Sequence, residues 1–146
     1  MGVSVTNIGS DTGQMAPMLD QIERRTGARP QEHLVDGGFV NLEAIEKAAA
    51  GTKVYAPPMS KKKGEPPSYE PKPDDTPRVA EWRSRMGTEE AKEVYKERAA
   101  TAELANAIVR EKQGFKIRVR GLQKVLAITL WHALAYNMSR WIALTS

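Results

Sequence analysis

The sequence predicts an α/β domain with a short, mostly parallel sheet, flanking helices and long C-terminal helices. Two short apolar runs, at residues 32–38 and 53–56, are separated by a segment with helical periodicity at 41–51, and another helical segment precedes them at 15–26. Strands and helices that alternate over short connections are typical of parallel crossover units. Val3–Thr6 alternates too briefly to define a strand by itself, but the turn residues after it fit a strand end, which would complete the pattern.

The first half of the chain contains clear boundary signals for these elements. Apolar residues recur with a helical period over 15–26, and Gly27 is placed to end that helix. The run EHLVDGG at 32–38 is typical of a buried parallel strand that opens into a loop, and Asp36 would lie on its carboxyl-terminal rim. Asn41 is a good N-cap for the next helix, whose apolar stripe contains Leu42 and Ile45.

The regular pattern ends at Pro57. Seven of the nine prolines lie between Pro57 and Pro77, together with three consecutive lysines. Such a composition does not bury a core, so residues 57–77 are predicted to form a disordered insert or linker. A short helical turn is expected at 76–86, with Trp82 as its anchor.

A long helix is predicted from Thr88 to Gln113, with Thr88 as its cap and two glutamates in its first turn. Glu103 is the only acid between Arg98 and Arg110, and its neighbours are mostly alanines. Arg110 follows Glu103 by one heptad and would share its helix face, so that this face could hold a metal ion and a phosphate together. A charge pattern that only keeps the helix soluble is the alternative.

The C-terminal segment is basic and apolar. Residues 114–146 contain five basic side chains and no acid, and four of the five lie in FKIRVRGLQK, namely Lys116, Arg118, Arg120 and Lys124. They could neutralise a run of phosphates, or form only a solvated basic turn. The apolar stretch at 125–144 is interrupted by polar residues before it could span a bilayer, which favours a buried terminal helix and no membrane association.

Composition excludes several classes of protein. The chain has 146 residues, which suits a single domain over 1–146, with 57–77 an insert and 114–146 a basic segment followed by an apolar helix. It contains no cysteine, which excludes a disulfide scaffold and a cysteine-ligated zinc site. The first residues lack the pattern of a secretory signal, so a cytoplasmic location is expected.

Two acids are the best candidates for chemistry, Asp36 at a strand end and Glu103 on the long helix. Carboxylates from a strand end and a neighbouring helix can share hard divalent ions such as Mg²⁺. Two such ions can activate a water or a 3′ hydroxyl and stabilise the leaving oxygen in phosphodiester chemistry. Any α/β domain, however, has some acid at a strand end.

Three motifs in order resemble the C-terminal half of the DDE transposases of bacterial insertion sequences, namely VDGGFVNLEAIE, YKERAATAELANAIVR and RVRGLQKVLAITLWHALAYNM. The resemblance implies a partial ribonuclease-H-like core and divalent-metal-dependent cleavage and joining of DNA, with Mg²⁺ or Mn²⁺ as cofactor. Asp36 matches the second acid of that family. The third acid lies in a signature of Tyr, two residues, Arg, three residues, Glu, six residues, Lys.

This chain departs from the signature in two places. Tyr95 and Arg98 keep their spacing, but four residues separate Arg98 from Glu103, and Arg110 stands in the Lys position. An arginine can still bind phosphate, with a forked geometry. The resemblance therefore implies Asp36 and Glu103 as catalytic metal ligands, and DNA contacts by Tyr95, Arg98 and Arg110. The basic run adds four candidate DNA contacts, namely Lys116, Arg118, Arg120 and Lys124.

The first acid of the family has no counterpart here, since it belongs to a strand upstream of anything that matches VSVTN. The chain is therefore expected to be a truncated catalytic core, inactive alone, that binds transposon ends and target DNA near the nucleoid. It could form homo-oligomers or associate with a full-length transposase. A non-catalytic DNA-binding or transposase-associating module is the second hypothesis, and an unrelated small α/β domain is the third.

Overall fold

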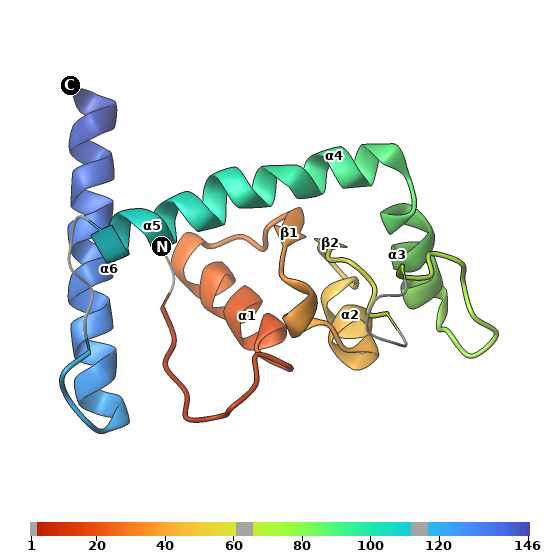
Figure 1. Ribbon diagram of the computed structural model, residues 1–146, viewed down its shortest axis with the longest axis horizontal. Helices are drawn as coiled ribbons and strands as arrows, with labels where there is room; N and C mark the ends of the chain where they lie inside the picture. The colour runs from red at the N-terminus through yellow and green to blue at the C-terminus, as the bar shows by residue number, and fades with distance from the viewer. Residues whose placement is uncertain (1–2, 61–65, 112–116) are drawn as a thin grey trace. The chain divides into compact units, whose positions relative to one another are not determined.

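The computed structural model describes residues 3–60, 66–111 and 117–146, and only the backbone of Glu103, Ala105 and Asn106. Figure 1 shows the elements in chain order. The chain forms two compact units, one made of Ser10–Arg98 and the other of Met1–Gly9 with Ala99–Ser146. Each unit is described below by itself.

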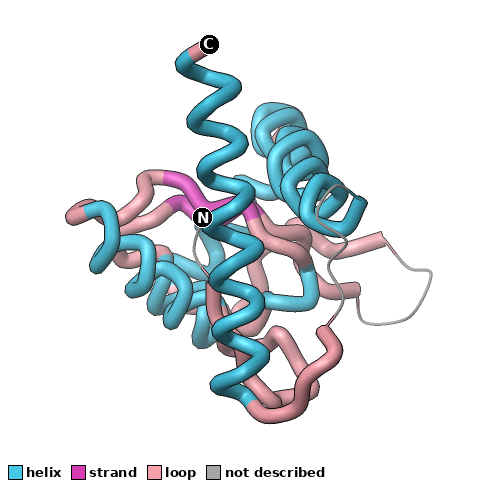
Figure 2. Tube along the Cα trace, turned by 90° about the vertical axis from the view of Figure 1, so that its left-hand side faces the viewer, coloured by secondary structure: helices cyan, strands magenta, loops and turns pink. Residues whose placement is uncertain are grey.

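The sheet of the first unit has two parallel strands, β1 (Glu32–Leu34) and β2 (Lys53–Tyr55), with Glu32 opposite Lys53 and Leu34 opposite Tyr55. They are visible as the magenta pair in Figure 2. The predicted pair of parallel strands is thus confirmed, although β1 ends at Leu34 and is only partly buried, because Glu32 lies exposed at its start. Val3–Thr6 is not a strand, because no strand in the described part of the chain pairs with it.

Helix α1 (Met15–Thr26) begins and ends where the periodicity predicts. Gly27 follows it with φ of 76°, a left-handed conformation that glycine adopts without steric cost, and its N–H donates to the carbonyl of Glu23 at 2.8 Å. Met15 and Leu19 are fully buried. The apolar stripe of α1 therefore faces the core.

Helix α2 (Leu42–Ala48) connects the two strands, after the short 3₁₀ turn η1 (Gly37–Phe39). The side chain of Asn41 accepts a hydrogen bond from the Ala44 N–H at 2.6 Å, which confirms it as the N-cap. Ile45 is fully buried, but Leu42 is 46% exposed. The prediction that Leu42 belongs to the apolar stripe is therefore wrong, because as the first residue of α2 it faces solvent.

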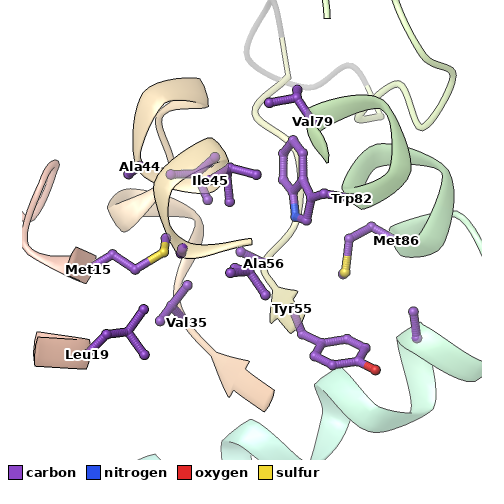
Figure 3. Close-up of a cluster of buried hydrophobic side chains, with 14 residues drawn as sticks. Met15, Leu19, Val35, Ala44, Ile45, Tyr55, Ala56, Val79, Trp82 and Met86 are labelled. Carbon is purple, nitrogen blue, oxygen red and sulfur yellow. The ribbon is translucent and has the colours of Figure 1, made fainter. Parts of the chain in front are cut away.

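Trp82 lies at the centre of the contacts between α3 and the rest of the core. Helix α3 (Pro77–Met86) begins after Thr76, whose hydroxyl accepts from the Val79 N–H. Trp82 is 1% exposed and belongs to one apolar cluster with Ile45, Val79, Met86 and Ala56, drawn in Figure 3. Trp82 is thus the anchor that the sequence predicts, on a helix rather than a single turn.

The proline-rich segment is attached to this unit at its described residues, so the prediction that it is disordered is wrong for them. Pro58 is buried, and Tyr69 packs against the core cluster. A Cβ on Gly87 would lie 2.9 Å from the Cβ of Tyr69, so the segment approaches α3 more closely than any other residue there would allow. Apolar and aromatic side chains between the prolines provide this attachment.

A buried ion pair fixes the end of the same segment. The Asp75 carboxylate accepts hydrogen bonds from the Arg83 guanidinium at 2.8 and 3.0 Å, and the two side chains are 1% and 5% exposed. Arg83 lowers the pKa of Asp75, an effect that the Lys72 backbone N–H strengthens. Such a pair is costly to break on one side only.

Helix α4 (Glu89–Arg98) packs against β2 and α3. The Thr88 hydroxyl accepts from the Ala91 N–H at 3.2 Å, as predicted for its cap. Ala91 is buried, while Val94 and Tyr95 pack against the core cluster. In Figure 1 the strand pair lies between α4 on one side and α1 and α2 on the other.

The second unit contains a π-helical segment, η2 (Ala99–Glu103), followed by α5 (Leu104–Glu111). The predicted helix is thus present through residue 111, and its predicted end at Gln113 lies outside the described residues. A final helix, α6 (Leu122–Thr145), contacts α5.

Helix α6 is not the buried helix that the sequence predicts. Ala133 is its only buried residue, while Trp131 and Trp141 are 70% and 67% exposed. Since α6 is apolar around its whole circumference, α5 can cover only part of it. Among the described helices, none is long and apolar enough to cross a membrane.

Replacing the central tryptophan should unfold the first unit more easily. Trp82→Ala removes a fully buried indole and leaves a cavity, so we expect it to lower the free energy of unfolding by about 3–5 kcal/mol. Trp131→Ala, at an exposed position, should change it by less than about 1 kcal/mol. Urea titration followed by circular dichroism measures both, and equal losses would contradict the assignment of the core.

Because of the Asp75–Arg83 pair, the free energy of unfolding should depend on pH. Because the folded pKa of Asp75 lies below its ordinary value of 3.8, its stabilising contribution is present at neutral pH and is lost as the pH falls through the folded pKa. Asp75→Asn should therefore cost about 3 kcal/mol near pH 7. The difference from the wild type should shrink steadily below pH 3.8. Urea titrations of both proteins across this range measure it, and a constant difference would contradict the pairing.

Candidate functional site

Asp36 stands at the carboxyl end of β1, on the rim that the sequence predicts. The Val35 N–H donates to the Tyr55 carbonyl at 3.0 Å, which extends the parallel pairing by one hydrogen bond beyond the strand. Val35 is buried, so the chain leaves the core at the next residue. The side chain of Asp36 is consequently 61% exposed.

A short turn fixes the direction of Asp36. Its backbone is extended, its side chain accepts from the Gly38 N–H at 3.4 Å, and its carbonyl accepts from the Phe39 N–H at 3.0 Å. Asp36 therefore caps η1 in addition to ending β1. This double role holds the carboxylate on a defined turn between two packed elements.

Helix α4 brings Arg98 to this carboxylate. Arg98 Nη2 lies 3.3 Å from Asp36 Oδ2, although 62 residues separate them in the chain. The arginine side chain is 24% exposed. Two residues that the resemblance assigns to one site, the strand-end acid and the signature arginine, are thus in contact.

Tyr95 lies one turn before Arg98 on α4, and the charges of Arg98 and Asp36 both affect the pKa of its phenol. Burial is the main cause that raises the pKa of the Tyr95 phenol. The negative charge of Asp36 raises it further, and the positive charge of Arg98 acts in the opposite direction. Tyr95 therefore borders the Asp36–Arg98 pair while it anchors α4 to the core.

The described side chains around Asp36 do not provide the ligands of a metal centre. Over residues 3–60, 66–111 and 117–146, no three His, Asp or Glu side chains form a cluster that could hold a metal ion. The charged partner of Asp36 is a guanidinium, which competes with a cation for the same oxygen. The predicted metal ligand Glu103 ends η2, and its side chain lies outside the described residues.

The other predicted DNA contacts lie in the second unit. Arg110 is exposed on α5, and Arg118, Arg120 and Lys124 are all exposed before and at the start of α6. Lys116 lies outside the described residues. The described basic side chains of this segment are therefore accessible, as a phosphate-binding role requires.

A cleft of the first unit lies away from Asp36. A cleft of about 420 Å³ opens at the amino ends of the two strands, next to Glu32 and Lys53, with Arg78, Glu81 and Arg85 on its wall. Asp36 follows the opposite, carboxyl end of β1. The cleft thus belongs to a different surface from the Asp36–Arg98 pair.

A comparison with protein families identifies the family of this chain. The model of the transposase DDE domain matches residues 59–142, which is more than half of the chain. The chain belongs to this family. No curated protein and no solved structure matches the chain.

The matched region contains the residues that resemble the family's signature but not Asp36. Tyr95, Arg98, Glu103 and Arg110 all lie within residues 59–142, whereas Asp36 precedes them. The case for Asp36 therefore depends on its place after β1 and on its contact with Arg98. A mixed structure of helices and a small parallel sheet is compatible with a ribonuclease-H-like fold.

The one-residue departure from the signature falls in the π-helical segment. Four residues instead of three separate Arg98 from Glu103, and η2 spans Ala99–Glu103. A π-turn closes with an i→i+5 hydrogen bond, so it contains one residue more than an α-turn. The position of the departure thus coincides with the π-helical segment.

Sequence reasoning missed the direct pairing of Asp36 with Arg98. It assigned the two residues to different ligands, one to a metal ion and the other to DNA. The only signal available was that the resemblance placed both in one site. It also missed Asp75–Arg83, because a composition rich in proline and lysine suggested a segment without fixed contacts.

Removing the bulge should be tolerated by the DDE domain. Deletion of Ala100 leaves the spacing of a regular α-helix, so we expect the melting temperature to change by less than ~2 °C. Deletion of Glu93, an exposed residue of α4, should lower it by ~4 °C or more, because Val94 and Tyr95 would turn away from the core. Thermal circular dichroism compares the two variants. Equal losses would mean that η2 is not a bulge formed by one residue.

Proposed function

We propose that this DDE domain takes part in DNA transposition and that the Asp36 rim, with Tyr95 and Arg98 of α4, is its face toward the reacting phosphodiester. The observation that carries the proposal is the contact between the strand-end carboxylate and the signature arginine, at 3.3 Å. The match of the family over residues 59–142 supports the DNA substrate. A guanidinium can stabilise the negative charge that develops on a transferring phosphoryl group.

Asp36 and Glu103 are proposed as the acidic residues of cleavage and strand transfer. Their carboxylates are the kind of oxygen ligand that Mg²⁺ or Mn²⁺ prefers. Arg98 and Arg110 are proposed to bind phosphates, since a guanidinium pairs with phosphate through two parallel hydrogen bonds. Tyr95 would position α4 and border the bound strand.

The basic residues before α6 are proposed as a second, sequence-independent contact with DNA. Arg118, Arg120 and Lys124 are exposed, and residues 114–146 contain no acid to oppose them. Each phosphate that such a side chain neutralises adds to affinity and to its dependence on salt. Lys116 is included in this contact because it lies in the same basic run.

A non-catalytic role is the second candidate, and the charge at Asp36 favours it. With Arg98 beside it, Asp36 contributes little net negative charge, so two carboxylates would hold two divalent ions weakly. We propose that the chain alone does not cleave DNA. It would then act as a DNA-binding or transposase-associating module, through homo-oligomers or through a longer transposase on α6.

One experiment separates these functions. The purified chain is incubated with supercoiled DNA and Mg²⁺ or Mn²⁺, and duplex binding is measured in parallel over a range of salt. We expect binding that weakens with salt and no cleavage. Neutralising Arg118, Arg120 and Lys124 together should weaken binding at least tenfold at physiological salt.

Substitutions of the two acidic residues decide between a catalytic and a non-catalytic role. Asp36→Ala and Glu103→Ala should retain DNA binding. Cleavage by the wild type that both substitutions abolish would instead establish a catalytic domain in this chain alone. Absence of DNA binding at every salt concentration would refute both roles.

A further inference from the structure

Helix α6 has an exposed apolar stripe along one side. At about 100° per residue, seven exposed apolar residues fall on this side. They are Ala127, Leu130, Trp131, Leu134, Met138, Trp141 and Ile142. The covered side chains of α6 lie on the opposite side, where Ala133 is buried and Val125, Thr129 and Tyr136 are half-buried. The stripe is therefore a separate surface from the one that the rest of the chain covers.

The stripe has a hollow near one end and a large side chain near the other. Ala127, Leu130, Trp131 and Leu134 line a shallow apolar hollow of about 290 Å³. Trp141 follows Ala127 by two heptads, and it is 67% exposed. Because interfaces pack as densely as protein interiors, such a hollow requires a bulky apolar side chain opposite it. The stripe thus contains both parts of a surface that fits a second copy of itself.

We propose that two copies of this chain pair through α6, antiparallel, about a two-fold axis at Leu134. The inference rests on the proposed non-catalytic role, whose homo-oligomers it specifies. In a two-fold pair each contact occurs twice, with the two partners exchanged. Trp141 of the second copy then lies opposite Ala127 and its hollow, and Met138 of the second copy lies opposite Leu130. Leu134 faces its own counterpart.

Charge selects the antiparallel direction. Residues 114–146 contain five basic side chains and no acid, so two copies of α6 have no opposite charges to pair. A parallel pair would place the two Lys124 ammonium groups side by side. In the antiparallel pair Lys124 lies opposite Leu144 of the second copy, and the two lysines are about 30 Å apart along the axis. This distance exceeds the screening length of about 8 Å at physiological ionic strength.

The stripe is large enough for a stable pair. Figure 1 shows α6 as one uninterrupted helix, and its 24 residues span about 36 Å. Trp131 and Trp141 are 70% and 67% exposed, and a covered aromatic side chain buries about 150–250 Å². Together with the aliphatic side chains between them, they approach the roughly 800 Å² that each partner buries in a standard interface.

Sedimentation equilibrium of the full chain without DNA tests the pair. We expect the wild type to form a dimer of 16.2 kDa chains. Leu134→Glu places two carboxylates against each other and should raise the dissociation constant about a hundredfold or more. Trp141→Ala empties the hollow and should raise it about tenfold or more.

Ser139→Glu is the matched control for Leu134→Glu. Ser139 is exposed on α6 but lies outside the stripe, so the added charge should leave the dimer unchanged. An equal loss of the dimer in both variants would show a general effect of charge and overturn the proposed interface.

Introduced cysteines test the direction of the pair, because the chain contains no cysteine of its own. In the antiparallel pair the two Leu130 residues lie about 12 Å apart along the axis, beyond the roughly 7 Å between Cα atoms that a disulfide can bridge. Leu130→Cys and Met138→Cys should therefore form no disulfide-linked dimer alone, but a mixture of the two should. Leu130→Cys that links to itself would show a parallel pair and overturn the proposed direction.

The remaining outcomes separate the pair from the proposed function. A monomeric wild type that binds DNA would overturn the pair and leave the DNA-binding role intact. A dimer that binds no DNA would refute the proposed function and leave the pair intact. A monomer that binds vesicles of phosphatidylcholine and phosphatidylserine, and loses them in Leu134→Glu, would assign the stripe to a lipid surface and overturn the pair.

Discussion

The packing of α4 on the small core is the constraint on which the candidate site depends. Two strands of three residues each cannot bury a core between them, so helices provide most of the apolar surface. Trp82 fills the space between α2 and α3, and Ala91 lets α4 approach β2 closely. Because the last turn of α4 contains Arg98, this packing decides where the guanidinium lies.

The local sequence predicted the elements of the first unit well. Gly27 and Asn41 lie within one or two residues of the helix ends that they define, and both cap their helices as predicted. Asp36 at a strand end followed from a short apolar run before two glycines. Such inferences succeed because capping and backbone conformation depend on neighbours in the chain.

Long-range contacts were not predictable in the same way. Nothing near Asp75 in the sequence marks it as buried, and its exposure of 1% depends on Arg83 in the next helix and on Tyr69 fixing the segment before it. The exposure of α6 was missed for a different reason. An apolar sequence predicts that a helix is buried, but it does not show which element covers the helix. Val3–Thr6 alternates only briefly and is not a strand in the described structure.

The fold decides which charge lies beside the Asp36 carboxylate. A carboxylate on an exposed rim could remain solvated, yet α4 places a guanidinium against it at 3.3 Å. A buried pair such as Asp75–Arg83 is suited to holding structure, because separating it strands a charge away from water. An exposed pair separates at little cost, since water solvates both groups at once. The DDE domain thus contains a buried ion pair that holds a segment in place and an exposed ion pair on the rim after β1.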